Sequence, residues 1–271
     1  MTQTTAYNSN LQGITRITVF SILSLLILSF SACQKAIIGS GPIVTETRST
    51  SNFTGVDVQL NAVVHVSQGS TTQVEVSAQQ NILDNLSIAV SGNQLVIREK
   101  KSTNIIDSKG ITVHIVTPDI QQLNMNGSGH IYLSDVSLNH TLTLDIDGSG
   151  KIDVQTLEAA ALNCSVSGSG DIAVQSCTVQ TIQSDISGSG TTTILSGSCT
   201  SSQSQISGSG KYNAVGVESQ FVNTSTSGSG KTSIWFVKTL HATISGSGDV
   251  YYKGEGTISK DISGSGKLIK L

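Results

Sequence analysis

The chain has 271 residues, of which 37% are hydrophobic, 12% are charged and 4% are aromatic. Its 15 basic and 18 acidic side chains give a formal net charge of −3, and it contains only two prolines. Low charge and many β-branched residues exclude intrinsic disorder, and a sequence without a basic cluster is not expected to bind nucleic acid. This length allows one or two domains. Because no helical pattern appears after residue 32, one elongated all-β domain is favoured.

Residues 1–32 are predicted to be a signal peptide. Arg16 precedes a mostly apolar run at 17–30, which is too short for a comfortable membrane span. Ser31 and Ala32 then lead directly to Cys33. This arrangement resembles a bacterial lipoprotein signal, although Phe30 stands where the usual pattern has leucine. The alternative is an ordinary secretory signal that is followed by a coincidental cysteine.

The resemblance implies that Cys33 is lipidated and becomes the new N-terminus. Acyl chains then anchor the protein to a membrane, since each buried CH₂ contributes about 0.8 kcal/mol. No aspartate follows Cys33, which by resemblance to enterobacterial sorting implies delivery to the outer membrane. Residues 33–44 are expected to be a short tether. Whether the protein faces the periplasm or the cell exterior is left open.

Residues 45–118 are predicted to form irregular β coils that cap the N-terminal end of the domain. Turn residues at 91–93 separate two apolar stretches, which is typical of a hairpin. Terminal repeats of solenoids are atypical because they cover the open end of the sheet. Alternating apolar and polar residues predict strands at 56–60, 63–66, 74–76, 86–90, 94–97 and 111–116.

Residues 119–271 are organised around a Gly-Ser-Gly triplet that occurs eight times, at intervals of 18 to 21 residues. The triplets begin at Gly127, Gly148, Gly168, Gly188, Gly208, Gly228, Gly246 and Gly264. A fixed period near 20 predicts one supersecondary unit repeated along an axis. Glycine suits the corner of such a unit because it reaches positive φ and has no Cβ where stacked backbones approach.

Strict alternation of apolar and polar residues on both sides of each triplet predicts strands with one buried face. The residues two before the triplets are Met125, Ile146, Val166, Ile186, Ile206, Thr226, Ile244 and Ile262. We therefore predict an all-β parallel β-helix, a solenoid with about 20 residues per coil. Each coil comprises a strand, a Gly-Ser-Gly corner, a second strand and a variable segment. A β-propeller would need about 40 residues per blade.

The signal, the triplets and the opening of the domain together resemble one family. The opening contains Gly39-Ser40-Gly41, Arg48, Phe53-Thr54-Gly55-Val56 and Gln68-Gly69. These features are similar to the head GIN domain family of putative autotransporter adhesins, found in envelope proteins of Bacteroidetes-type bacteria. The resemblance covers nearly all of the chain after residue 32. It implies an extracytoplasmic binding or structural role and supplies no catalytic residues.

A carbohydrate-active β-helix enzyme, either a lyase or a hydrolase, is the main alternative. Such an enzyme needs convergent carboxylates or a cation site on one face of the rod. Asp145 and Asp185 are expected to lie two coils apart, roughly 10 Å at the usual strand spacing, so we favour a non-catalytic protein without a cofactor. The candidate carboxylates are Asp145, Asp147, Asp153, Asp171 and Asp185.

The histidines and cysteines offer few sites. The five histidines have no metal-ligand spacing, and no metal site is expected. Cys164 stands at an inward position and is expected in the core. Cys177 and Cys199 are 22 residues apart, close to one coil, so a disulfide between them is possible in an oxidising periplasm.

Trp235 and Tyr251 are the candidates for ligand contact. Alternation points both side chains outward near the C-terminal end, where an exposed aromatic patch would bind a glycan or a protein surface. Packing in the core of the shorter final coils is the alternative. The leading functional hypothesis is a lipid-anchored envelope protein that binds another surface without catalysis. A structural periplasmic spacer is a further alternative.

Overall fold

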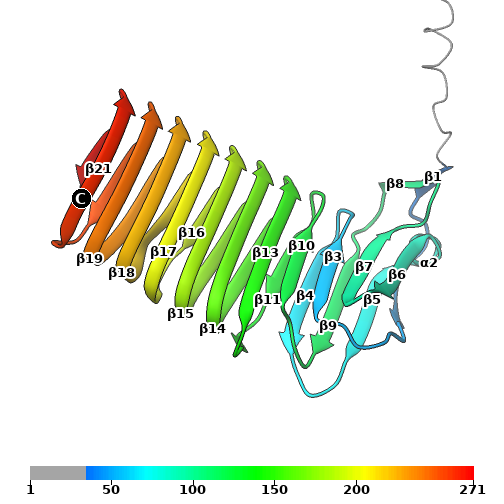
Figure 1. Cartoon of the computed structure of the whole chain (residues 1–271). Helices are drawn as coiled ribbons and strands as arrows, with labels where there is room; N and C mark the ends of the chain where they lie inside the picture. The colour runs from blue at the N-terminus through cyan, green and yellow to red at the C-terminus, as the bar shows by residue number, and fades with distance from the viewer. Residues whose placement is uncertain (1–34) are drawn as a thin grey trace, which may run out of the picture.

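Alternating apolar and polar residues fold into stacked parallel strands that wind around one elongated core (Figure 1). The computed structural model describes residues 35–271. The predicted signal peptide at 1–32 and the predicted lipidation site at Cys33 lie outside the described residues. In the described part of the chain, no helix reaches the length and hydropathy that a membrane span needs.

The N-terminal cap combines parallel and antiparallel pairing. Strands β3 and β4 pair in parallel with β10 and β11 of the first regular coil, and also with β7 and β9 of the cap. Antiparallel pairing of β2 with β5, β5 with β9, and β6 with β7 completes the cap. The elements of the cap are β1 (Lys35–Ile38), β2 (Ile43–Thr47), β3 (Gly55–Val58), β4 (Val63–Gln68), β5 (Gln73–Gln79), α2 (Gln80–Leu83), β6 (Leu86–Ser91), β7 (Gln94–Glu99), β8 (Thr103–Asp107) and β9 (Thr112–Thr117).

The expected hairpin is present as β6 and β7, and the expected strand at 111–116 is β9. The four-residue helix α2 was not expected, and it buries Ile82 and Leu83 against the cap. Strand β1 falls within the segment expected to be a tether, where it pairs in parallel with β8.

The regular coils stack in parallel along the rod. Their strands are β10 (Gln122–Met125), β11 (His130–Leu133), β12 (Val136–Ser137), β13 (Thr141–Gly148), β14 (Lys151–Gly168), β15 (Asp171–Gly188), β16 (Thr191–Ile194), β17 (Gly197–Gly208), β18 (Lys211–Gly228), β19 (Lys231–Gly246), β20 (Asp249–Lys253), β21 (Thr257–Gly264) and β22 (Lys267–Lys270). Residues that are 20 apart lie side by side, as Ile146 does with Val166 and Val166 with Ile186. The prediction of a parallel β-solenoid is confirmed.

The Gly-Ser-Gly triplets form the expected corners. Gly168 has a φ of 114°, a conformation that costs a residue with a Cβ considerable strain. A Cβ on Gly168 would lie 2.6 Å from the carbonyl oxygen of Gly148 in the preceding coil. The backbone N–H of Ser169 donates to that same oxygen at 2.9 Å. Coils therefore stack too closely at this corner to accept a side chain on its first glycine.

The segment between the second strand and the next triplet is also strand. In β14 the extended backbone runs for 18 residues, and Leu157 and Ala159 continue the inward alternation past the far corner. Alternation hides this corner from a sequence search, because the chain bends there without glycine or proline.

The core changes from apolar to hydroxylic along the rod. Leu144 and Cys164 stack on Ser184, which stacks in turn on Ser204 and Thr224. All five side chains are buried. The hydroxyl of Ser204 donates to Thr224 Oγ1 at 2.8 Å, so part of this polar interior is satisfied by neighbouring coils.

Candidate ligand-binding face

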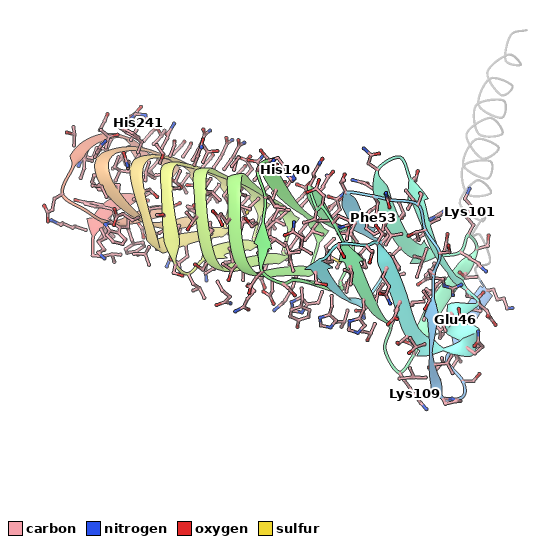
Figure 2. The ribbon with its side chains drawn as sticks, turned by 90° about the horizontal axis from the view of Figure 1, so that it is seen from below. Glu46, Phe53, Lys101, Lys109, His140 and His241 are labelled. Carbon is pink, nitrogen blue, oxygen red and sulfur yellow. The ribbon has the colours of Figure 1, made fainter. Side chains whose placement is uncertain are left out.

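The outward side chains of the regular coils form straight columns because the strands are in register. One column contains the residue that directly follows each triplet, and side chains of this kind line the rod on both of its long sides (Figure 2). We call it the post-corner column. Its members are His130, Lys151, Asp171, Thr191, Lys211, Lys231, Asp249 and Lys267. Neighbours within a column are one strand spacing apart, about 4.8 Å.

Trp235 and Tyr251 lie on this outward face near the C-terminal end. Tyr251 is in register with Ser233, and Trp235 is in register with Lys253. Both aromatic side chains are half-buried. Lys253 Nζ lies 3.8 Å from the centroid of the Trp235 ring, a cation–π contact, and the Tyr251 hydroxyl donates to Asp249 Oδ2 at 3.4 Å. The two rings are therefore held on the surface by charged neighbours.

The inward alternative applies to the residues that follow them in sequence. Phe236 is fully buried, and Tyr252 packs against the core with its ring centroid 5.8 Å from that of Phe236. Alternation thus places one member of each aromatic pair inside and the other outside. Ligand contact by Trp235 and Tyr251 stays a prediction.

Two exposed lysines of the post-corner column stand next to each other. Lys211 and Lys231 are in register on β18 and β19. Among residues 35–271, neither lysine forms an ion pair. By contrast, Lys151 lies 3.6 Å from Asp171 in the same column. Like charges on neighbouring strands destabilise a sheet slightly, so this pair is unusual for a surface without a ligand.

Acidic groups adjoin the same face. Asp249 is in register between Lys231 and Lys267, and it accepts a hydrogen bond from the Lys267 backbone N–H at 3.1 Å. Glu218 is in register with Trp235. The face is therefore cationic overall, with the lysines Lys211, Lys231, Lys253 and Lys267 set against these two carboxylates.

These lysines were missed in the sequence because they are separated by about one coil each. Reading along the strands shows single charges between polar residues. Aligning the triplets and reading the next residue of each repeat would have found the column, since Lys211, Lys231 and Lys267 all follow Gly-Ser-Gly directly.

A stack of four rings forms a second feature, at the junction between the cap and the first regular coil. The ring centroid of His65 lies 4.9 Å from that of His114 and 5.1 Å from that of Tyr132. His130 covers the other face of Tyr132 at 3.8 Å, and its Nε2 lies 2.6 Å from Asp153 Oδ2. Burial lowers the pKa of His65, and the neighbouring His114 and His130 lower it further.

An open hollow of about 480 Å³ adjoins this stack, and its polar lining includes Tyr132, Asp135, Asp153, Gln155 and Gln175. The stacked neighbours cover both faces of the Tyr132 ring, so the hollow receives only the edge of that ring. Within the part of the chain that the structure describes, no three side chains of the metal-ligating types converge.

The carboxylates considered for catalysis are dispersed. Asp145 and Asp185 belong to one column but are separated by Ser165, as expected. Asp145 accepts a hydrogen bond from Gln122 Nε2 at 3.1 Å, and Asp185 accepts one from Gln183 Nε2 at 2.8 Å. Asp147 lies beside Ser167. Because Asp153 and Asp171 are tied to His130 and Lys151, this set has no pair placed for acid–base work.

The cysteines are buried and free. The register places Gly197, not Cys199, opposite Cys177, while Cys199 lies opposite Ser219. The disulfide considered between Cys177 and Cys199 is not formed, because their spacing of 22 exceeds the local coil by two residues. Burial raises the pKa of the Cys177 thiol to about 12. Burial also raises the pKa of Cys199, whose Sγ contacts Ser219 Oγ at 3.2 Å.

Comparison with known families agrees with this architecture. The family described as "putative auto-transporter adhesin, head GIN domain" matches residues 52–256. The chain belongs to this family. The head GIN domain therefore includes most of the cap and nearly all of the regular coils. Among curated proteins, none matches the sequence.

Solved structures share the fold of this head GIN domain. A putative adhesin from Parabacteroides distasonis is 22% identical with a TM-score of 0.82, and the match covers 88% of this chain and 100% of that chain. A putative lipid binding protein from the same organism is 24% identical with a TM-score of 0.83, over 88% and 100% of the two chains. A putative adhesin from Parabacteroides merdae is 21% identical with a TM-score of 0.80, over 88% and 99%. At these identities the likeness establishes the fold.

Family membership and the solenoid together support a non-enzymatic surface or envelope protein. In this setting the outward face that carries Trp235, Tyr251 and the neighbouring lysines is the candidate binding surface of the head GIN domain.

Proposed function

We propose that this chain is a lipid-anchored protein of the outer membrane whose head GIN domain binds a glycan or protein surface without catalysis. The observation that carries the proposal is the outward face of β18–β20. There Trp235 and Tyr251 are held at the surface, and Lys211 and Lys231 stand side by side without an ion pair to another described residue. Side chains ordered in this way by a rigid sheet suit recognition, since little conformational freedom is lost on binding.

The position of this face supports the same role. Strand β1 begins at one end of the rod and the C-terminal coils form the other end (Figure 1). If Cys33 carries the lipid, the binding face projects away from the membrane by the length of the solenoid. A spacer would need the length alone, and it would not need adjacent lysines that repel each other.

Dispersed carboxylates argue against the enzyme alternative. A lyase or hydrolase requires two groups that reach one scissile bond. Here Asp153 and Asp171 are engaged by His130 and Lys151, and Asp145 and Asp185 are separated by a whole coil. The proposal therefore assigns these carboxylates to the polar surface of the rod.

Protease shaving and antibody labelling of intact cells test the proposal, with Cys33→Ala as the control for anchoring. The wild-type protein should be labelled and shaved on intact cells, and the Cys33→Ala protein should leave the membrane fraction. Labelled cells should also adhere to a glycan or protein surface more strongly than cells that lack the protein. Protection of the wild-type protein until the outer membrane is permeabilised would contradict the adhesion role and favour a periplasmic spacer.

A further inference from the structure

We infer that the C-terminal face of the solenoid binds an acidic polysaccharide. We call this surface the distal face and define it by Lys211, Lys231, Lys253, Lys267, Trp235 and Tyr251, with Asn213 and Ser233 between them. The inference rests on the proposed binding function and names the chemical class of the ligand.

The charge of the rod changes sign along its length. Residues 119–210 contain eight carboxylates and one lysine, which gives a net charge of −7. Residues 211–271 contain seven lysines and four carboxylates, which gives +3. The middle of the rod therefore repels a polyanion and the distal coils attract it, so the field directs such a ligand to one end.

Within the distal coils, the lysine pair provides the anion site. The ammonium groups of Lys211 and Lys231 project from neighbouring strands on the same face, and each is exposed. Their mutual repulsion is unrelieved by any ion pair to the described chain. An anionic group placed between them would remove this repulsion and form two charge-assisted hydrogen bonds.

Neighbouring side chains add contacts that suit a sugar ring. Asn213 and Ser233 follow the two lysines on the same face and supply an amide and a hydroxyl for hydrogen bonds to sugar hydroxyls. Trp235 and Tyr251 supply aromatic surface, against which the apolar face of a sugar ring stacks. Because the lysine column repeats along the rod axis at about 4.8 Å per coil, a polymer that runs along this axis meets several of these groups.

The acidic neighbours set the limit of the site. Asp249 lies in register between Lys231 and Lys267, and Glu218 lies beside Trp235. They leave the Lys211 end of the face as its most cationic part. The anionic groups of the ligand are therefore expected at Lys211 and Lys231, with neutral sugar units over Trp235 and Tyr251.

An anionic membrane is the competing partner, and the face fits it less well. Interfacial binding to lipid requires a continuous apolar surface that enters the acyl region. On the distal face the aromatic rings are half-buried and alternate with Asn213, Ser233 and lysines. This alternation favours a hydrated polymer.

Binding by the full-length protein, reconstituted in phosphatidylcholine nanodiscs, tests the inference. The immobilised probes are hyaluronan as a carboxylated polysaccharide, dextran as a neutral one, and captured vesicles of phosphatidylcholine mixed with phosphatidylglycerol. We expect capture by hyaluronan, with affinity that falls as salt is raised. Capture by dextran to the same extent, by the anionic vesicles alone, or by none of the probes would overturn the inference.

Variants locate the site. Lys211→Gln/Lys231→Gln should weaken binding to hyaluronan by roughly tenfold or more. Lys100→Gln/Lys101→Gln removes the same two charges at the cap and should leave binding within about twofold of wild type. Figure 2 shows Lys101 at the cap and His241 at the distal end, so the two pairs lie at opposite ends of the rod. Equal losses from both double variants would show non-specific attraction and overturn the site.

Trp235→Ala should also weaken hyaluronan binding, and it should not change the salt dependence, because it removes ring contact without charge. Failure of the inference is distinguishable from failure of the proposed function. Cells that display the protein and adhere to a protein surface, while their protein ignores hyaluronan, would retain adhesion and lose the polysaccharide assignment.

Discussion

The carbonyl oxygen of Gly148 lies 2.6 Å from the position that a Cβ on Gly168 would occupy. This approach recurs at the first glycine of the later triplets, so each coil depends on the glycine of the coil before it.

Gly168→Ala should therefore destabilise the solenoid by about 3 kcal/mol, from backbone strain at positive φ together with the clash. Gly127→Ala is the matched control. Its Cβ would meet Leu60 at an ordinary 3.7 Å, and the φ of Gly127 is not positive. Chemical unfolding of both variants measures the difference. Equal destabilisation would mean that the corner tolerates a side chain.

Tyr212→Phe should cost about 1–3 kcal/mol of unfolding free energy even though it keeps the ring. Tyr212 is fully buried, and its hydroxyl lies 3.1 Å from Ser202 Oγ. Removing that hydroxyl leaves Ser202 in the core without this partner. The double variant Tyr212→Phe/Ser202→Ala should recover part of the loss in the same unfolding experiment. A double variant less stable than the single one would contradict this account.

Acidification should weaken the junction between the cap and the first regular coil through His65. Its pKa is lowered in the folded state by burial, and also by His114 and His130. A histidine held neutral in the fold loses stability as pH falls below the unfolded pKa of about 6.5. We expect the unfolding midpoint of wild type to fall between about pH 7 and pH 5, and that of His65→Gln to fall less. Because the site is partly exposed, the difference should be modest.

The ion pair of His140 and Asp119 has the opposite sign. A backbone hydrogen bond to Thr141, together with Asp119, raises the pKa of His140. Its contribution is complete below the unfolded pKa and is lost as pH rises through the folded value. His140→Gln should therefore steepen the acid sensitivity attributed to His65. An unchanged pH profile in both variants would exclude these histidines as its cause.

The buried thiols should be unreactive in the native protein. Burial raises the pKa of Cys177 to about 12 and also raises those of Cys164 and Cys199, so the thiolate is scarce at neutral pH. A thiol reagent should modify Cys164, Cys177 and Cys199 only after unfolding, and a reductant should leave the unfolding midpoint unchanged. A midpoint that falls on reduction would reveal a disulfide between Cys177 and Cys199.

Much of the solenoid could be predicted because it is written at short range. The inward residues two before each triplet, from Met125 to Ile244, are all buried, since strand alternation and the period together fix both face and neighbour. The cap was only outlined. Antiparallel pairing of β2 with β5 joins Thr45 to Ser77, and no local pattern encodes a contact over that distance.

The candidate site was half predicted for a related reason. Trp235 and Tyr251 were placed outward by alternation along their own strands. Lys211 and Lys231 become neighbours only when adjacent coils are superposed, so they are visible across the repeat and not along it. The expected disulfide failed because Cys199 lies two residues past the position that the register places opposite Cys177.

Lysine footprinting on the full-length protein in nanodiscs tests the central claim most directly. The protein is acetylated with and without hyaluronan, and modification of each lysine is read by mass spectrometry. The account predicts that the polymer protects Lys211 and Lys231 strongly and Lys253 and Lys267 in part, while Lys100 and Lys101 at the cap are modified as before. Uniform protection of all lysines, or protection at the cap alone, would contradict a binding face on the distal coils.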